Sequence, residues 1–246
     1  MKDLIMKDKN NVCAVIWDFD GTLVDSKHKN FNVTKKIIKK VTGKNADQFS
    51  IFDSVEKYYA ANTKASNWRT FYEELLEIPA DKINEAGMLW SEYQLCDDTP
   101  VNFYSGIASV LGALGSLPHG VVSQNSRDII QQVFKKNNLS DSFKYVVGYE
   151  EVDITKQKPE PDGLLYCIEK LTGLKPGTIF YIGDLESDIQ CAVNANQILN
   201  NKNIDINIIS IFAKYDSVQD LNLWDCKPDF IAETVEDIYK IINQCH

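Results

Sequence analysis

The stretch VCAVIWDFDGTLVDS, Val12 to Ser26, joins a continuous apolar run to three closely spaced carboxylates. Its first six residues have the length of a strand and do not alternate with polar residues, which is typical of a strand covered on both faces in a parallel sheet. Asp18 and Asp20 follow two residues apart, so both side chains face the same way if the chain stays extended. The stretch therefore predicts a central strand with paired carboxylates at its carboxyl end.

Four more apolar runs of strand length follow along the chain, at residues 120–123, 145–148, 178–183 and 206–212. Amphipathic patterns with helical spacing come after three of these runs, at residues 126–137, 161–173 and 187–196. Strands that alternate with helices are typical of a parallel sheet wrapped by helices. The expected fold class is therefore α/β, with a doubly wound, Rossmann-like parallel sheet as its core.

An insertion interrupts this alternation between the first and second strands. About a hundred residues separate them, whereas a crossover needs only a few tens. Residues 27–98 show helical spacing of apolar residues, as at Phe71, Leu75 and Ile78, and no convincing strand. We expect a small α-helical domain over 27–98, inserted into a core domain made of residues 1–26 and 99–246. Its aromatic residues are expected to form its own core, namely Phe49, Phe52, Tyr58, Tyr59, Trp68, Phe71 and Tyr72.

Composition narrows the function classes. The chain has 246 residues, 44% hydrophobic content and a formal net charge of −9, which suits a globular protein and disfavours nucleic acid as a partner. No apolar run reaches the roughly 20 residues of a membrane span, and charges interrupt the N-terminal segment where a signal peptide has its apolar core. The six cysteines are scattered without a C-x-x-C pair, so we expect reduced thiols and a cytoplasmic protein.

The carboxylates after the first strand indicate chemistry at the edge of the sheet. Ligands of open α/β sheets bind at the carboxyl ends of the strands. Two close carboxylates repel each other, so bringing them together is costly unless a cation or a proton intervenes. Gly21 permits a tight turn after Asp20, and Thr22 either bonds a ligand oxygen or caps the next segment. The pattern therefore indicates a metal site.

At this point the residues carry a family resemblance. DFDGTLVDS, residues 18–26, resembles the first motif of the haloacid dehalogenase superfamily, in its phosphatase-type branch with two aspartates. The remaining motifs match in order: Ser123 ends the second strand, Lys158 precedes a helix, and the acidic pair Asp184 and Asp188 follows an apolar strand. A helical cap after the first motif is also usual in this branch. The resemblance extends over almost the whole chain.

The expected catalytic residues have chemical reasons of their own. Asp18 would attack phosphorus and form an aspartyl-phosphate, since carboxylate nucleophiles divide one difficult step into two. Asp20, crowded by other carboxylates, would protonate the leaving alcohol and then deprotonate the hydrolytic water. Lys158 would neutralise Asp18 and the transferring oxygens. The dehalogenating branch lacks the second aspartate, so the presence of Asp20 disfavours dehalogenation.

The cofactor and the phosphate contacts follow from the same resemblance. Mg²⁺ prefers hard oxygen ligands and usually takes one or two protein carboxylates together with substrate phosphate and water. The resemblance implies Asp18, Asp184 and the main-chain carbonyl of Asp20 as ligands, with Asp188 as a further ligand or a supporting residue. The residues expected to hold phosphate oxygens are Ser123, Gln124, Asn125 and Thr22.

The leading expectation is a Mg²⁺-dependent phosphatase, a phosphoric monoester hydrolase acting on a small phosphorylated metabolite and similar to phosphoglycolate phosphatases. A sugar-phosphate mutase of the β-phosphoglucomutase type shares these motifs and stays open as an alternative. A non-catalytic binding module is a remote second alternative, because it would be marked by loss of motifs that are present here. The sequence identifies neither the leaving group nor the oligomeric state.

Overall fold

The computed structural model describes residues 11–65, 68–217 and 219–244. The chain divides into two compact units. We call residues 1–24 together with 103–246 the core unit, and residues 25–102 the helical unit. The expected insert, residues 27–98, falls inside the bounds of the helical unit. Two short strands, β2 (Val24–Asp25) and β3 (Asn102–Phe103), pair with each other where the chain passes from one unit to the other.

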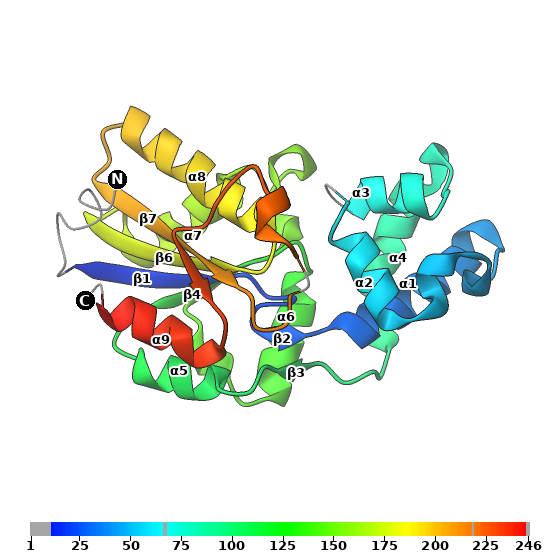
Figure 1. Ribbon diagram of the computed structural model, residues 1–246, viewed down its shortest axis with the longest axis horizontal. Helices are drawn as coiled ribbons and strands as arrows, with labels where there is room; N and C mark the ends of the chain where they lie inside the picture. The colour runs from blue at the N-terminus through cyan, green and yellow to red at the C-terminus, as the bar shows by residue number, and fades with distance from the viewer. Residues whose placement is uncertain (1–10, 66–67, 218, 245–246) are drawn as a thin grey trace. The chain divides into compact units, whose positions relative to one another are not determined.

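The core unit contains a sheet of six parallel strands in the order β5-β4-β1-β6-β7-β8 (Figure 1). Its strands are β1 (Val12–Trp17), β4 (His119–Val122), β5 (Tyr145–Val147), β6 (Gly177–Gly183), β7 (Ile206–Ala213) and β8 (Phe230–Ala232). The expected α/β fold class with a parallel Rossmann-like sheet is confirmed.

Helices cover both faces of this sheet, which explains the continuous apolar runs of its strands. On one face α7 (Asp162–Thr172) and α8 (Glu186–Asn201) pack against side chains of β1 and β6 in an apolar cluster of the core unit. On the other face α5 (Ile107–Ala113) lies against α9 (Val235–Gln244), and α6 (Arg127–Lys136) completes the layer (Figure 1). Side chains of both orientations are therefore buried in every strand of the sheet except the edge strand β8, where Ile231 is exposed.

The strand order reverses at β1, with β4 on one side and β6 on the other. The main-chain N–H of Asp18 donates to the carbonyl of Ile182 at 2.7 Å, so β1 and β6 stay in register up to the residues that follow them. In a sheet of this order, the point of reversal opens a crevice outside the carboxyl ends of the strands. The residues after β1 and β6 lie at that crevice.

The expected strands agree with the observed ones to within a residue at each end. The helix expected at 187–196 begins at Glu186 and continues to Asn201, so the polar run in its second half is helical rather than a loop. The expected elements do not include β8, α5 or α9. A three-residue strand such as β8 is too short to show the periodicity that marks a strand, which explains why β8 was not expected.

The helical unit is built from α1 (Lys27–Thr42), α2 (Val55–Asn62), α3 (Trp68–Thr70) and α4 (Ile83–Cys96), joined by short 3-10 and π turns. In α1 pairs of exposed lysines alternate with pairs of buried aliphatic residues, for example Lys35 and Lys36 with Ile37 and Ile38. This spacing places one apolar stripe on the inner side of the helix. The stripe packs into an apolar cluster that belongs to the helical unit alone.

Six of the seven expected aromatic residues form this internal core, whereas the half-buried Tyr59 is not part of it and has the ammonium group of Lys27 over its ring, 4.5 Å from the centroid. Phe52, Tyr58, Phe71 and Tyr72 are buried in it, and Phe49 and Trp68 pack against it. The expected inward position of Leu75 is wrong, because its side chain is 40% exposed. Residues Phe71–Leu75 form a π-helical turn, whose wider spacing moves the fourth residue after Phe71 off the buried face.

The described cysteines form no disulfide among themselves. Cys13, Cys96, Cys167, Cys191 and Cys226 are free thiols, and Cys245 lies outside the described residues. Within the described part of the chain, no helix has both the length and the apolar character required to cross a membrane.

Candidate active site

A buried ion-pair cluster lies at the carboxyl ends of β1 and β6, and Lys158 is at its centre. The ammonium group of Lys158 donates to Oδ1 of Asp18 at 2.5 Å and to Oδ1 of Asp188 at 2.6 Å. Asp18 follows β1, Lys158 lies in the loop before α7, and Asp188 lies in the first turn of α8. All three side chains are buried, and the contact of Lys158 with Asp18 joins positions 140 residues apart.

Asp188 is held from three directions. Besides Lys158, the hydroxyl of Tyr181 donates to its Oδ1 at 2.9 Å, and the main-chain N–H of Leu185 donates to its Oδ2 at 3.1 Å. The position of Gly183 is also adapted to Asp188, since a Cβ there would lie 2.3 Å from the carboxyl carbon of Asp188. Both of its oxygens are therefore engaged by the protein, which favours a supporting role in which Asp188 holds Lys158.

Asp184 follows β6 and lies against the turn after β1. Gly21 has φ +82° in this turn, and a Cβ on it would lie 2.3 Å from Oδ2 of Asp184. The hydroxyl of Thr22 donates to Oδ1 of Asp184 at 3.4 Å, and the Thr22 side chain is fully buried. Gly21 therefore leaves the space that the carboxylate of Asp184 fills, and the hydroxyl of Thr22 orients that carboxylate.

The residues present fit a divalent cation. Carboxylate oxygens of Asp18, Asp184 and Asp188 lie within 4.8 Å of one another, and all three residues are buried. Oxygen-only donor sets of this kind suit Mg²⁺. A cation between Asp18 and Asp184 would offset the charge that Lys158 leaves uncompensated, since Lys158 already bonds Asp18 and Asp188.

The protonation of the cluster follows from its burial and its neighbours. Burial opposes a charged Lys158, but the attraction of Asp18 and Asp188 outweighs it and raises the pKa of Lys158, which stays an ammonium ion. Burial raises the pKa of Asp18, Lys158 lowers it, and the charges of Asp188 and then Asp184 raise it further. Without a cation, the site thus holds carboxylates that repel one another around a single lysine.

The loop after β4 carries the expected phosphate contacts. The hydroxyl of Ser123 accepts a hydrogen bond from the main-chain N–H of Asn125 at 3.0 Å, which closes a tight turn. The side-chain amide of Asn125 donates to Oδ2 of Asp20 at 2.9 Å, and its Oδ1 accepts from the N–H of Ser126 at 2.8 Å. Asn125 therefore links the loop to Asp20, a half-buried residue of the β1 motif.

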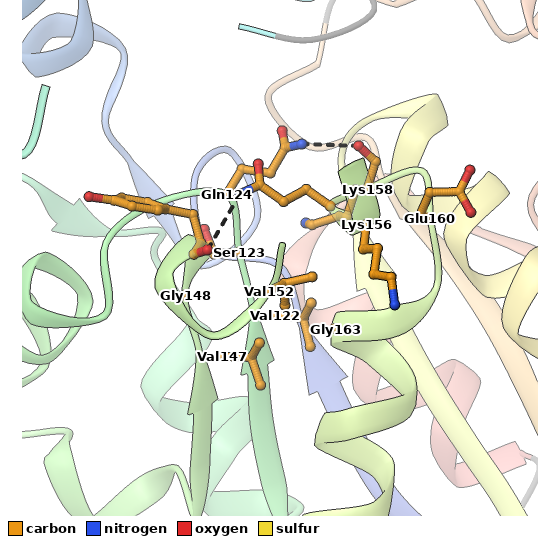
Figure 2. Close-up of a pocket in the computed structure, with 12 residues that line it drawn as sticks. Val122, Ser123, Gln124, Val147, Gly148, Val152, Lys156, Lys158, Glu160 and Gly163 are labelled. Carbon is orange, nitrogen blue, oxygen red and sulfur yellow. Dashed lines mark hydrogen bonds between the residues drawn. The ribbon is translucent and has the colours of Figure 1, made fainter. Parts of the chain in front are cut away.

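Gln124 joins this loop to the loop that carries Lys158. Its side-chain amide donates to the main-chain carbonyl of Lys158 at 3.0 Å (Figure 2). A small cavity of about 10 Å³ lies beside the bond and is lined by Ser123, Gln124 and Lys158 together with residues of β5 and α7. The cavity has room for about one water molecule. The phosphate loop and the lysine loop are thus held together directly.

The structure places each expected residue as follows. Asp18, Lys158, Asp184 and Asp188 converge, and the carboxylate of Asp20 is bonded to the side-chain amide of Asn125 in the loop after β4. Thr22 contacts Asp184, which favours an orienting role for its hydroxyl over direct contact with phosphate. The main-chain N–H of Asn125 donates to the hydroxyl of Ser123, so it is not reserved for a ligand.

Tyr181 is a site residue that the sequence analysis did not identify. It lies inside the apolar run of β6, where it reads as a core aromatic residue. The only signal was general, because a tyrosine hydroxyl in a strand covered on both faces needs a buried partner. Gln219 is a second site residue that was not expected from the sequence. Its side-chain amide donates to the main-chain carbonyl of Asp184 at 3.2 Å, and no motif marks it.

Comparisons with known proteins give the following. A phosphoglycolate phosphatase from Escherichia coli (strain K12) is 32% identical over 88 residues, which is 35% of this chain and only about a third (34%) of that protein. A phosphoglycolate phosphatase from Synechococcus elongatus is 23% identical over 234 residues, 94% of this chain and 97% of that protein. A solved structure described as a predicted phosphatase from Clostridium acetobutylicum has the same fold, with a TM-score of 0.73 and 19% identity over 96% of this chain and 100% of that chain.

A family model described as haloacid dehalogenase-like hydrolase matches residues 15–198. The matched range runs from β1 to α8 and includes every residue of the ion-pair cluster. The chain belongs to the haloacid dehalogenase-like hydrolase family.

Proposed function

We propose that the protein is a Mg²⁺-dependent phosphatase that hydrolyses a small phosphorylated metabolite through an aspartyl-phosphate on Asp18. The observation that carries the proposal is the buried contact of Lys158 with Asp18 and Asp188, with Asp184 within 4.8 Å, at the crevice between β1 and β6. Buried carboxylates gathered around one lysine are costly for stability, which supports a role in catalysis rather than in folding.

In the first step Asp18 attacks phosphorus. A carboxylate oxygen forms the new bond to phosphorus, and the bond to the leaving alcohol oxygen breaks. Asp20 gives its proton to that oxygen, and the amide of Asn125 keeps the carboxyl group of Asp20 oriented. Lys158 holds Oδ1 of Asp18, which limits the directions from which the carboxylate can approach phosphorus.

In the second step water attacks the phosphoryl group on Asp18. Asp20, now a carboxylate, takes the proton of the water, and the bond between Asp18 and phosphorus breaks. Inorganic phosphate leaves, and both aspartates return to their starting protonation states. The same residue acts first as an acid and then as a base, so one well-oriented carboxyl group serves both steps.

The phosphoryl oxygens are held by groups of the loop after β4 and by Lys158. Among the described residues, the main-chain N–H of Gln124 donates no hydrogen bond, so it is available to a phosphoryl oxygen beside the hydroxyl of Ser123. The loop is followed by α6, whose N-terminus favours negative charge nearby. The bond from Gln124 to the Lys158 carbonyl keeps these donors at a constant separation.

Asp18, Asp184 and the main-chain carbonyl of Asp20 would hold the Mg²⁺ ion, and Asp188 would act through Lys158. When bound, the ion supplies positive charge that stabilises the charge developing on the phosphoryl oxygens. The orientation of Asp184 is provided by the chain itself, through Gly21 and Thr22.

The substrate class and the cellular setting are part of the same proposal. The relatives named as phosphoglycolate phosphatases support a small phosphorylated acid or sugar and favour hydrolysis over the mutase alternative. We assign the helical unit the role of a cap that selects the leaving group. The free thiols of the described cysteines suit a reducing, cytoplasmic setting.

The test is release of inorganic phosphate from p-nitrophenyl phosphate and from a panel of small phosphorylated acids and sugars, with Mg²⁺ and with EDTA. We expect turnover with Mg²⁺ and none with EDTA. Phosphate release without formation of a phosphate isomer excludes the mutase, and turnover that is unchanged in EDTA contradicts the role of the metal. A protein that binds these compounds without turnover would be the non-catalytic module.

Asp18→Asn should reduce turnover to background and leave the circular dichroism spectrum unchanged, because the amide keeps the shape of the side chain but is a poor nucleophile. Asp53→Asn is the matched control, since Asp53 is an exposed carboxylate of the helical unit paired with Lys57. The control should keep full activity. Activity of Asp18→Asn within tenfold of wild type would rule out the covalent route.

A further inference from the structure

The segment that follows β7 contacts main-chain carbonyls of the site, and no sequence motif marks it. We call residues 214–226 the latch segment, of which residue 218 lies outside the described part of the chain. The hydroxyl of Tyr215 donates to the main-chain carbonyl of Thr22, in the turn after β1. The side-chain amide of Gln219 donates to the main-chain carbonyl of Asp184 at 3.2 Å. One segment thus contacts both of the turns that carry the proposed metal ligands.

The side chain of Gln219 is held in one orientation. The indole N–H of Trp224 donates to Oε1 of Gln219 at 3.0 Å. Because an indole can only donate and a main-chain carbonyl can only accept, the amide oxygen of Gln219 must face Trp224 and its NH₂ group must face Asp184. Trp224 is itself buried and packs on Phe212 of β7, with ring centroids 4.7 Å apart, and on Ile189 of α8.

The far end of the latch segment is tied to the start of α8. Oε1 of Glu186 accepts hydrogen bonds from the main-chain N–H groups of Asp225 at 2.5 Å and Cys226 at 2.9 Å. Glu186 is two residues after Asp184 and begins the helix. The segment is therefore bonded to the chain on both sides of the strand-to-helix junction at which Asp184 lies.

This junction is where the sheet no longer holds the backbone. The ladder between β6 and β7 ends at the pair Gly183 and Phe212, one residue before Asp184. The carbonyl of Asp184 lies past the ladder, and Gln219 supplies a donor in place of the missing strand neighbour. A hydrogen bond at this carbonyl limits rotation of the peptide between Asp184 and Leu185, and with it the direction of the Asp184 side chain.

We propose that Gln219 is a positioning residue that sets the Asp184 carboxylate for metal binding, with Trp224 fixing the orientation of its amide. The inference rests on the proposed function, in which Asp184 is a Mg²⁺ ligand. Partners that orient metal ligands are usually important for metal affinity, and their loss typically weakens binding by about ten- to a hundredfold. The expected consequence is a change in Mg²⁺ affinity rather than in the chemistry at saturating metal.

The decisive variant is Gln219→Glu. A glutamate can still accept from Trp224, but it has no donor for the Asp184 carbonyl, and its second oxygen repels that carbonyl. By charge alone, an added carboxylate near the site would strengthen cation binding. The positioning role predicts the opposite, a concentration of Mg²⁺ for half-maximal effect that rises by about tenfold or more.

Trp224→Phe is the second variant, because it removes the donor to Gln219, adds no charge and keeps an aromatic ring against Phe212. It should raise the Mg²⁺ requirement in the same direction by a smaller factor. Gln131→Glu, the same change at an exposed position of α6, is the matched control and should behave as wild type.

The measurement is the shift in melting temperature with Mg²⁺ concentration, read against each protein's own melt in EDTA, alongside the Mg²⁺ dependence of phosphate release. A raised half-maximal Mg²⁺ concentration in both variants, with turnover at saturating Mg²⁺ largely retained, supports the proposal. Variants that bind Mg²⁺ as wild type does would show that Gln219 only closes a loop, while the proposed function stands. A wild type with neither a Mg²⁺ shift nor turnover contradicts the proposed function and this inference together.

Discussion

Gly21 has no side chain at the point where the carboxylate of Asp184 approaches the turn after β1. Its φ of +82° lies in the left-handed region, and a Cβ would come within 2.3 Å of Asp184. Gly43, at the end of α1, has a similar φ of +75° but nothing within 4 Å of its position. Both glycines therefore have a left-handed backbone conformation, but only the position of Gly43 has room for a side chain.

Gly21→Ala should lower the free energy of unfolding more than Gly43→Ala does. Both substitutions carry the cost of a left-handed non-glycine residue, about 1 to 2 kcal/mol. Only Gly21→Ala also displaces Asp184, so it should lose activity as well. Urea denaturation in EDTA and phosphate release at saturating Mg²⁺ measure the two effects. Equal losses of stability and full activity in both variants would mean that the contact with Asp184 has no consequence.

Tyr181 shows how a buried hydroxyl supports the ion-pair cluster. Its ring is fully buried in β6, and its hydroxyl donates to Oδ1 of Asp188 at 2.9 Å. Burial, followed by the charge of Asp188, raises the pKa of Tyr181 well above its usual range, so it stays a neutral donor.

Tyr181→Phe should lower the free energy of unfolding by about 1.5 to 3 kcal/mol, the usual range for a hydrogen bond to a charged group. Tyr145→Phe is the control, because its hydroxyl bonds only that of Tyr166 in a half-buried position, and it should change stability by less. Urea denaturation of both variants provides the comparison. A loss for Tyr181→Phe no larger than that for the control would show that the bond to Asp188 is not important for stability.

At the scale of the elements, β1 and β4 are joined by side chains as well as by their ladder. The indole N–H of Trp17 donates to Nδ1 of His119 at 3.1 Å. Since that nitrogen accepts, the imidazole proton is on Nε2, which lies 3.3 Å from the carbonyl of Leu114. Burial lowers the pKa of His119 to about 4, and the bond to Leu114 opposes this.

This arrangement predicts a specific pH dependence of stability. The unfolded chain protonates His119 near pH 6.5, whereas the folded protein does so only near pH 4, so the unfolded state binds the extra proton between these values. The contribution of neutral His119 to the free energy of unfolding is fully present above pH 6.5 and falls as the pH is lowered toward 4. Its size is about 1.4 kcal/mol per pH unit, or roughly 3 kcal/mol over the whole window.

His119→Gln removes this titration and leaves that of the remaining groups. The difference in unfolding free energy between wild type and variant should therefore shrink as the pH falls from 7 to 4. Urea denaturation at several pH values measures it, and the exposed His28→Gln controls for the loss of one histidine. A difference that stays constant with pH would contradict the neutral, buried state of His119.

At the scale of the whole molecule, stability and metal binding are linked through the site. Without metal, burial and then the charges of Asp188 and Asp184 raise the pKa of Asp18, and Lys158 bonds Asp18 and Asp188. A cation that binds the folded site and hardly the unfolded chain stabilises the protein by about 2.7 kcal/mol at a hundred times its dissociation constant. Removing one carboxylate should reduce both the repulsion and this gain.

Asp184→Asn should be at least as stable as wild type in EDTA, because the amide keeps the shape and removes a repelling charge. In saturating Mg²⁺ it should gain much less than wild type and lose activity. Thermal melts of both proteins under the two conditions test this directly. Equal shifts with Mg²⁺ would mean that Asp184 is not a ligand.

Much of this fold was predictable from local pattern. The apolar runs that form β1, β4, β5, β6 and β7 match these strands to within a residue at each end, and their continuity reflects burial on both faces. The carboxylates Asp18 and Asp184 were also predictable as site residues, because a charge directly after a buried strand is unfavourable unless it has a function. Leu75 was not predictable in this way, since a π turn changes the spacing on which a helical pattern depends.

What the sequence by itself determined is therefore the parallel α/β core, the helical insert and the chemical types gathered at the sheet edge, because burial and charge act on neighbours along the chain. Only the tertiary structure decided that Lys158 pairs with Asp18 and Asp188, that Thr22 turns to Asp184, and that Gln219 contacts its carbonyl. These contacts join residues up to 162 positions apart. They depend on which strand ends the parallel sheet places side by side, and no local pattern of residues records that order.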